Sequence, residues 1–411
     1  MIATQETIDA TAAIFDDLRC QKNTSLDNLL ETPDGRRILS CIQCGTCAGT
    51  CPYGEHMDYP PRRIINMLQR GLIDEVFRSD SMLRCVSCYA CMAKCPRNIR
   101  LSDVLLPLVK EQTLIHLTEM PAELQKSLQN TLRYGNPMGE SSRKRAAWTA
   151  TAGVPVPTIG EKGGVADILW FVECYTSYYA RGQDNSRATA RLFHALGLDF
   201  AILGNEEKCA GDCGQLTWES GLFETLTDYN MVVFGKYKFK RLVTGDPHAF
   251  NAFRIRYPLF GFDYPVDHTT PLLHGHLDRL KPMLKKKLDC TVTYHDSCCL
   301  GRRAGCYEPP RELLRAIPGV KLVEMTHNRV NAICCGGGGG GMWLDTFFKA
   351  KGMERLSERR IREAIRTGAD VLAVSCPYEI SRFEDALKTV GHDKPIVVRD
   401  VVELLADSLG D

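Results

Sequence analysis

The sequence predicts an α/β protein in two parts, with a short helical domain ahead of a duplicated unit built on open parallel sheets. Two observations lead to this fold class. Eight of the 19 cysteines form two copies of one pattern within the first quarter of the 411-residue chain. Beyond them, the same succession of β-branched runs, helical segments and cysteines occurs twice. Such self-similarity is typical of a duplicated structural unit.

The two cysteine motifs, CIQCGTCAGTCP and CVSCYACMAKCP, both have the spacing C-x2-C-x2-C-x3-C-P. Three closely spaced thiolates can converge on one iron-sulfur cluster, whereas the fourth, followed by proline, points toward a second cluster. Structural zinc sites usually present two separated cysteine pairs, so this spacing disfavours zinc, and disulfides are less favoured still. We therefore expect two 4Fe-4S cubanes with exchanged fourth ligands: Cys41, Cys44, Cys47 and Cys95 for one, and Cys85, Cys88, Cys91 and Cys51 for the other.

The composition excludes several classes of protein. The net charge is +1 without a long basic block, which gives no support for nucleic-acid binding. The N-terminus lacks the basic start and apolar core of a secretory signal. No run of eighteen apolar residues occurs, so we expect no membrane span in the chain itself. These features predict a cytoplasmic protein, peripheral to a membrane only through a partner, in which cysteines serve as metal ligands.

One segment connects the two cysteine motifs and another connects the predicted domains. Residues 60–79 place apolar side chains at Ile64, Leu68, Leu72 and Val76, a spacing that predicts one helix packed against the cluster region. The stretch 133–164 is rich in Gly, Pro, Ser and Thr and has no sustained period, which indicates a linker. We therefore expect a helical domain at 1–125, a linker at 126–165, a first repeat at 166–285 and a second repeat at 286–411.

The two repeats can be matched position by position. Cys174 corresponds to Cys298, Cys209 to Cys334, Ala210 to Cys335 and Asp246 to Cys376. Cys174, Cys298 and Cys376 each follow a predicted strand, at the edge where open α/β sheets hold their ligands. Helical segments such as 353–368, with Gly368 as its C-terminal cap, separate the strands.

From Ile38 to Leu387 the chain resembles the subunits of heterodisulfide reductase. The cysteine motifs and the helix between them look like its C subunit, and the repeats look like its B subunit with the CCG motif. Joined in one chain, they resemble the D subunit and the related K subunit of the sulfite-reductase-associated membrane complex. The segments NPMG (136–139) and HDSCCLGR (295–302) fit the same superfamily. The resemblance implies a ferredoxin-like two-cluster domain followed by Rossmann-like cysteine-rich domains.

In that family the cysteine-rich repeats hold noncubane 4Fe-4S clusters, which implies a third cluster here. Its ligands would be Cys298, Cys334, Cys335 and Cys376, but Glu379 stands where the motif has its last cysteine. Four thiolates suffice for a cubane, whereas a noncubane cluster would need a substitute from Cys299, Cys306 or the Glu379 carboxylate. We expect the backbone at Gly336 and Gly337 to approach the cluster rather than a phosphate, because the run lacks the Lys-Ser/Thr of a phosphate loop. Arg302 could offset the cluster's charge.

The first repeat departs further from the motif. Only Cys174 and Cys209 remain, while Ala210, Asp246 and Ala249 occupy the other positions. Cys213 could supply a third thiolate, but cubanes usually take four. The sequence therefore predicts a first repeat without a cluster.

These features predict an electron-transfer subunit of a larger oxidoreductase, relaying electrons between two cubanes and the C-terminal cluster. The alternative is a catalytic subunit that reduces or oxidises a disulfide or thiol at that cluster, with an accessible Cys299 or Cys306 and a cleft between the repeats. No G-x-G-x-x-G fingerprint follows a predicted strand, so we expect any flavin or nicotinamide on another chain. The resemblance implies a flavin-bearing electron-bifurcating subunit, a membrane cytochrome b or an electron-transferring flavoprotein as partners.

Overall fold

The computed structural model describes residues 23–217, 219–391 and 396–410. The N-terminal stretch that lacks a secretory signal lies outside these residues. The chain forms two compact units. The first unit contains the residues up to Leu124 together with Leu216–Ser220 and Gly338–Met353, and the second unit contains the rest. A segment from within the second repeat thus belongs to the same compact unit as the cysteine motifs.

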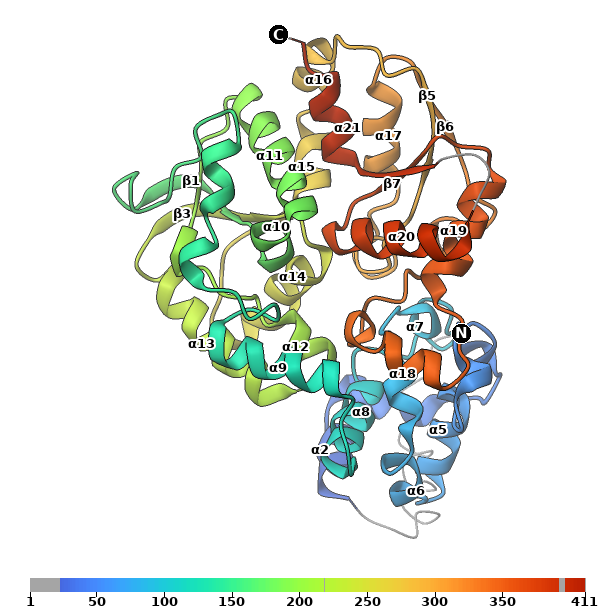
Figure 1. Ribbon diagram of the computed structural model, residues 1–411. Coiled ribbons are helices and arrows are strands. Elements are labelled where there is room, and N and C mark those ends of the chain that lie inside the picture. Colours follow the sequence, from blue (N-terminus) through green and yellow to red (C-terminus); the bar gives the residue numbers. More distant parts are fainter. Residues whose placement is uncertain (1–22, 218, 392–395, 411) are drawn as a thin grey trace. The chain divides into compact units, whose positions relative to one another are not determined.

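Short helices build the first unit (Figure 1). They are α2 (Thr24–Glu31), α3 (Pro33–Arg36), α4 (Thr46–Gly49), α5 (Pro61–Gln69), α6 (Ile73–Phe77), α7 (Ala90–Ala93), α8 (Leu105–His116) and α18 (Asp345–Ala350). The 3-10 turns η1 (Arg37–Ser40), η2 (Gly54–His56), η3 (Asp80–Arg84) and η11 (Gly341–Trp343) connect them. No helix in the described ranges is long and apolar enough to cross a membrane.

The prediction of one continuous helix over residues 60–79 is wrong. The chain forms α5 and α6 as separate helices, with a break at Gly71, whose φ of 72° lies in the left-handed region. Ile64, Leu68 and Val76 are buried as the pattern predicts, whereas Leu72 lies between the helices and is partly exposed.

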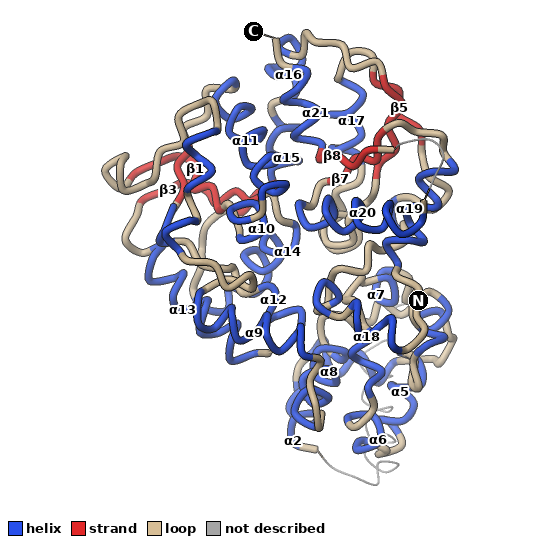
Figure 2. The backbone as a smooth tube through the Cα atoms, in the orientation of Figure 1, coloured by secondary structure: helices blue, strands red, loops and turns tan. Residues whose placement is uncertain are grey.

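The second unit contains two four-stranded parallel sheets, whose strands are red in Figure 2. The first has the order β2-β1-β3-β4 and the second has the order β6-β5-β7-β8. Their strands are β1 (Val165–Phe171), β2 (Phe200–Ile202), β3 (Lys238–Thr244), β4 (Val266–His268), β5 (Cys290–Tyr294), β6 (Val320–Val323), β7 (Val371–Val374) and β8 (Val397–Asp400). The identical strand order confirms the predicted duplication and the open α/β fold class.

Helices follow the strands in each repeat, as parallel connections require. In the first repeat they are α10 (Cys174–Tyr178), α11 (Ala180–Ala195), α12 (Asp212–Thr217), α13 (Ser220–Phe234), α14 (Pro247–Asn251), α15 (Thr269–Gly275) and α16 (Leu277–Leu280), with the π-helical η7 (Ala252–Arg256). In the second repeat they are α17 (Glu308–Ala316), α19 (Leu356–Arg366), α20 (Pro377–Val390) and α21 (Val401–Ser408). Further 3-10 turns are η6 (Gly204–Glu206), η8 (Tyr257–Phe260), η9 (Lys281–Met283) and η10 (Arg329–Asn331).

The stretch for which the sequence predicts a linker is packed against the first repeat. It begins with the end of α9 (Ala122–Tyr134) and contains the 3-10 turns η4 (Ser142–Lys144) and η5 (Ala147–Thr151). Trp148 is 2% exposed, and its ring lies edge-on to Trp170 of β1 at 5.5 Å between centroids. Because this indole is buried in the core shared by both sheets, the segment contributes to folding rather than only joining two domains.

A buried ion-pair network supports the loop after β5. Arg311 of α17 is fully buried and donates to both carboxylate oxygens of Asp296, at 2.7 and 2.8 Å, and to both of Glu324. Asp296 in turn accepts from the backbone N–H of Arg329. Burial opposes ionisation of Asp296, but the guanidinium prevails and lowers the pKa of this carboxyl. Arg311 therefore fixes the start of the segment that leads to Cys298.

We expect Arg311→Met to destabilise the second unit, because Asp296 would be left buried and unpaired at a cost of about 3–5 kcal/mol. Urea unfolding followed by circular dichroism should show a lower midpoint for this variant. The matched control is Arg315→Met, which removes an exposed arginine from the same helix. Equal midpoints for the two variants would contradict the assigned role of Arg311.

Candidate metal centres

The two cysteine motifs adopt the same local backbone. Gln43 and Ser87 have φ values of 56° and 48°, and two residues later Gly45 and Tyr89 have φ values of 86° and 60°. Each left-handed residue at the second position precedes a single helical turn, α4 or α7, that carries the third cysteine. Non-glycine residues adopt such φ angles only where the surroundings impose them, so the fold imposes the same turn on both motifs.

The structure brings the eight cysteines together in two sets. One small cavity is lined by Cys41, Cys44, Cys47 and Cys95, and a second is lined by Cys51, Cys85, Cys88 and Cys91. The fourth cysteine of each motif thus lies with the first three of the other. Four converging thiols are the donor set that a 4Fe-4S cubane takes, so these residues fit the cluster that the spacing predicts.

The two sets differ in exposure. Cys44 is exposed, whereas Cys88 and Cys91 are buried and Cys91 Sγ lies 3.2 Å from Ser102 Oγ. Burial raises the pKa of the Cys47 thiol to about 11 and raises that of Cys91 well above its usual range. Iron ligands must be thiolates, so metal binding would stabilise a charge that burial alone disfavours at these sites.

A buried lysine lies beside the second set. Nζ of Lys110, on α8, donates to the carbonyl oxygens of Cys85 at 2.9 Å and Gly339 at 2.6 Å. Burial lowers the pKa of this ammonium to about 8, against the influence of Cys85. Gly339 has φ of 60°, and a Cβ atom there would lie 2.2 Å from the Cys85 carbonyl oxygen. Only glycine allows this close approach of two backbones.

In the second repeat, cysteines from three loops converge. Cys298 follows β5, Cys334 and Cys335 follow β6, and Cys376 begins α20 after β7. The Cys298 thiol lies beside those of Cys299 and Cys334, and the Cys335 thiol lies beside that of Cys334. All five of these cysteines are buried. They provide the thiol set expected for a third cluster, with Cys299 as an additional thiol.

Two polar groups border this thiol set. Cys376 lies with Asp246 and His248 of the first repeat, their ligand atoms all within 4.8 Å of one another, and His248 Nδ1 is 3.3 Å from Cys299 Sγ. On another side, Glu379 lies with Cys335 and His295 within the same limit. The carboxylate that replaces the last cysteine of the motif is therefore beside the thiols.

Hydrogen bonds fix the orientation of His295. Arg360 Nε donates to Nδ1 at 2.9 Å, so the ring proton is on Nε2, which lies 3.2 Å from Glu379 Oε1. Histidine, arginine and carboxylate are all buried, so this arrangement holds Glu379 beside Cys335 through a fixed tautomer.

The remaining predicted residues have distinct surroundings. The backbone N–H groups of Gly336 and Gly337 donate to Sγ of Cys334 and Cys335 at 3.3 and 3.4 Å. Arg302 donates to the carbonyl oxygens of Val330 and Ala332 in the loop before Cys334, and its charge acts on Cys298. Cys306 lies near Asp296, and burial together with this carboxylate raises the pKa of its thiol to about 11.

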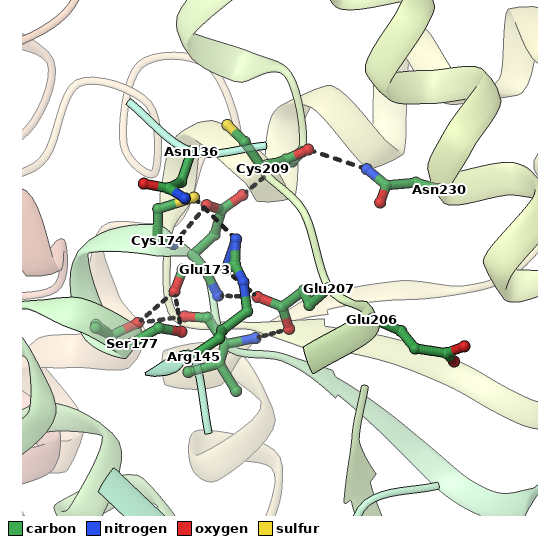
Figure 3. A network of polar contacts seen from close by, with 12 residues as sticks. Asn136, Arg145, Glu173, Cys174, Ser177, Glu206, Glu207, Cys209 and Asn230 are labelled. Atoms are coloured by element: carbon green, nitrogen blue, oxygen red, sulfur yellow. Dashed lines mark hydrogen bonds and ion pairs between the residues drawn. The ribbon is translucent and has the colours of Figure 1, made fainter. Parts of the chain in front are cut away.

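The first repeat has a buried polar network at the corresponding sheet edge (Figure 3). Arg145 donates to Cys174 Sγ at 3.1 Å and to Glu207 Oε1 at 2.9 Å. Glu207 accepts from the backbone N–H groups of Val172 and Glu173. Cys209 Sγ is 3.8 Å from Cys213 Sγ, and Glu173, Cys174 and Cys209 have ligand atoms within 4.8 Å of one another.

Sequence reasoning missed several of these residues. Lys110 lies in an ordinary helical pattern, and its neighbours Cys85 and Gly339 are distant in sequence, so no local signal identifies it. Arg145 lies in the stretch interpreted as a linker. Glu173 and His248 each flank a matched position of the repeat, and a comparison of charged residues between the repeats could have found them.

Comparison with known families agrees with this organisation. Residues 37–99 match the 4Fe-4S dicluster domain, and residues 168–254 and 292–378 each match the cysteine-rich domain with the CCG motif. The chain is therefore an iron-sulfur protein that binds 4Fe-4S clusters.

Two relatives resemble the chain over most of its length. A probable iron-sulfur-binding oxidoreductase of Bacillus subtilis is 36% identical over 345 residues, covering 82% of the chain and 48% of the relative. An EtfAB:quinone oxidoreductase of Syntrophomonas wolfei is 28% identical, covering 89% of the chain and 57% of the relative. The chain thus spans about half the length of these two relatives.

A third relative matches from end to end. The D subunit of the dihydromethanophenazine:CoB–CoM heterodisulfide reductase of Methanosarcina barkeri is 31% identical over 426 aligned residues, covering 95% of the chain and 97% of the relative. The order of domains, the paired cysteine motifs and the duplicated sheets are those expected from this resemblance. The chain therefore belongs to the family of the heterodisulfide reductase D subunit.

Proposed function

We propose that the chain is an electron-transfer subunit of a multi-subunit oxidoreductase complex, relaying electrons between two cubanes in the first unit and a 4Fe-4S cluster in the second repeat. The observation that carries the proposal is the contact of Lys110 with both Cys85 and Gly339. It connects a ligand of one cubane to the glycine run that begins after Cys335.

Chain length supports a short path between these centres. Gly339 is four residues beyond Cys335, and an extended chain spans at most about 3.6 Å per residue, or about 14 Å in all. This limit follows from covalent geometry, whatever the arrangement of the two units. The cluster at Cys335 and the cubane at Cys85 would therefore be joined by a short stretch of backbone and one buried hydrogen-bonding lysine.

The other cubane would serve as the outer end of the relay. Cys44 is exposed, and Ile42 beside it is 60% exposed, whereas the thiols of the second set are more deeply buried. An exposed apolar side chain next to a cluster ligand suits a redox partner that docks and leaves. We propose a flavoprotein or a membrane cytochrome b in this role, and a cytoplasmic location with membrane association only through that partner.

The names of the relatives suggest which partners to test first. The Syntrophomonas relative is named an EtfAB:quinone oxidoreductase, and a Chromohalobacter relative is named a probable membrane-anchored ferredoxin. By analogy, an electron-transferring flavoprotein is our first candidate donor and a membrane quinone-reducing subunit our first candidate acceptor.

A second candidate function is disulfide or thiol chemistry at the C-terminal cluster, and the contact between Cys299 and His248 favours it. Two observations make it the weaker choice. Cys299 is only 1% exposed. The groove of about 860 Å³ between the repeats is lined by side chains of α11, α20, β8 and α21, and none of its lining residues is a cysteine.

The iron content and two cysteine variants test the exchange of the fourth ligands between the two motifs. Anaerobically purified protein should contain about twelve irons, four for each of three clusters. Cys95→Ser should remove the paramagnetic signal of the cluster at Cys41, Cys44 and Cys47, while Cys51→Ser should remove that of the other cubane. Each variant should keep the remaining clusters in electron paramagnetic resonance spectra.

Cys290→Ser serves as the control, because this partly exposed cysteine lies in β5, outside all three thiol sets. If Cys95→Ser instead removed the signal of the cluster at Cys85, Cys88 and Cys91, each motif would hold its own cubane and the exchange would be wrong.

Lys110→Met should lower the reduction potential of the cubane at Cys85, because reduction adds negative charge and the variant lacks the neighbouring cation. Each 1 kcal/mol of lost interaction corresponds to about 40 mV for a one-electron couple. Potentiometric titration monitored by electron paramagnetic resonance measures the shift. Lys349→Met, which removes an exposed lysine from α18, should leave the potential unchanged.

Gly339→Ala should slow electron transfer from the cubanes to the C-terminal cluster, because the new Cβ would force the backbone away from Cys85. Overpacking of this kind costs about 1–3 kcal/mol of stability. Rapid freeze-quench spectroscopy after flash reduction would measure the rate. The matched control is Gly352→Ala, where φ is 67° but no atom lies within 4 Å of the added Cβ. Equal rates in both variants would exclude the glycine run from the path.

A further inference from the structure

Three carboxyl groups in the first repeat meet where a cluster would be expected. Glu173 follows β1, Asp212 follows β2 and Asp246 follows β3, so each comes from a different loop at the same sheet edge. All three are buried, with exposures of 1%, 5% and 1%. One oxygen from each lies within 4.8 Å of the others. Carboxylates so close together repel one another strongly at low dielectric.

No described lysine or arginine forms an ion pair with any of these three carboxylates. The nearest buried cation, Arg145, is paired with Glu207 and with the Cys174 sulfur. Buried carboxylates without a partner are costly, and proteins commonly pair them with a cation or a metal ion. The network therefore has an excess of acidic groups that its side chains do not balance.

Asp246 provides an independent indication of a missing ligand. Its Oδ1 accepts from the backbone N–H of His248 at 2.8 Å and caps α14, while its Oδ2 is buried and has no hydrogen-bond partner. Asp246 occupies the position of Cys376 in the second repeat, at the start of the helix after the third strand. An oxygen donor thus replaces a thiolate at the same place in the fold.

Sulfur donors complete the set. Cys209 Sγ lies 3.6 Å from Asp212 Oδ1, and Glu173, Cys174 and Cys209 have ligand atoms within 4.8 Å of one another. The backbone N–H of Gly211 donates to Cys209 Sγ at 3.4 Å, the counterpart of the bond from Gly336 to Cys334. The geometry of a cluster-binding loop is therefore kept, although Ala210 and Asp246 replace two of its cysteines.

Glu173 retains capacity for a ligand. Its Oε1 accepts from the backbone N–H of Ala210 at 3.0 Å, and its Oε2 accepts from that of Cys174 at 2.8 Å. Each carboxylate oxygen has two acceptor sites, so both oxygens can still bind a metal ion. The two backbone bonds would hold the carboxylate in a fixed orientation.

We propose that the first repeat binds one divalent transition-metal ion through Glu173, Asp212 and Asp246, with Cys209, whose Sγ lies beside Asp212 and Glu173, as a sulfur ligand. Mixed carboxylate and thiolate donors select zinc or ferrous iron over the harder magnesium and calcium ions. The site takes the place of the cluster that the sequence predicts to be absent. Since Asp246 also lies beside Cys376, the ion would place positive charge next to the C-terminal cluster.

The test is the metal content of anaerobically purified full-length protein, measured by inductively coupled plasma mass spectrometry. One zinc or iron per chain is expected beyond the cluster iron. Asp246→Asn and Glu173→Gln should each lose that ion while retaining the cluster iron and the circular dichroism spectrum. Glu206→Gln is the matched control, since this neighbouring carboxylate is partly exposed and bonds to Lys236.

Anomalous diffraction at the zinc and iron edges would locate the ion, with a peak at about 2.0–2.2 Å from the Glu173 and Asp246 carboxylates. Should either variant fail to fold, dialysis of the wild-type protein against a chelator and reloading with zinc or ferrous iron gives the same comparison. Metal content equal in wild type and both variants, or no anomalous peak at these residues, would overturn the proposal.

Discussion

The first unit depends on the exchange of its fourth cysteines. Each thiol set contains three cysteines from one motif and one from the other, so neither set can be completed within a single motif. The helices α5 and α6 lie in the chain between the motifs, and their buried faces fix the separation at which both sets close. If these sets hold the clusters, metal binding and folding of this unit would be coupled, since cysteines distant in sequence must come together for either cluster to form.

The second unit also brings together residues that are distant in sequence, but it does so with parallel sheets. Parallel sheets of identical strand order bring three loops to one edge, and the loops carry the polar and sulfur groups in both repeats. The two repeats share this scaffold, while the groups it carries differ. Cys335 and Cys376 in one repeat correspond to Ala210 and Asp246 in the other, so a shared backbone supports thiol-rich and carboxylate-rich surroundings.

Much of this organisation could be predicted from the sequence because it rests on local spacing. The two cysteine motifs, the alternation of strands and helices, and the matched positions of the repeats all appear as short patterns. Long-range features left no such pattern. The glycine run divides between the two units after Gly337, and nothing in six consecutive glycines marks that point. Gly71, in the left-handed region, separates α5 from α6 although the apolar spacing continues across it, so that spacing alone does not reveal the break.

The thiol sets of the first unit and of the two repeats differ more in the charged groups beside them than in their cysteines. At the thiol set that contains Cys85, the buried ammonium of Lys110 donates to the carbonyl oxygen of that cysteine, beside thiols that would become negative on binding iron. In the second repeat, Arg360 donates to His295 and pairs with Glu363, while the charge of Arg302 acts on Cys298. In the first repeat, Arg145 is already paired with Glu207 and Cys174. Electrons moving along the chain would therefore meet a different local field at each centre, and such fields help to set cluster potentials.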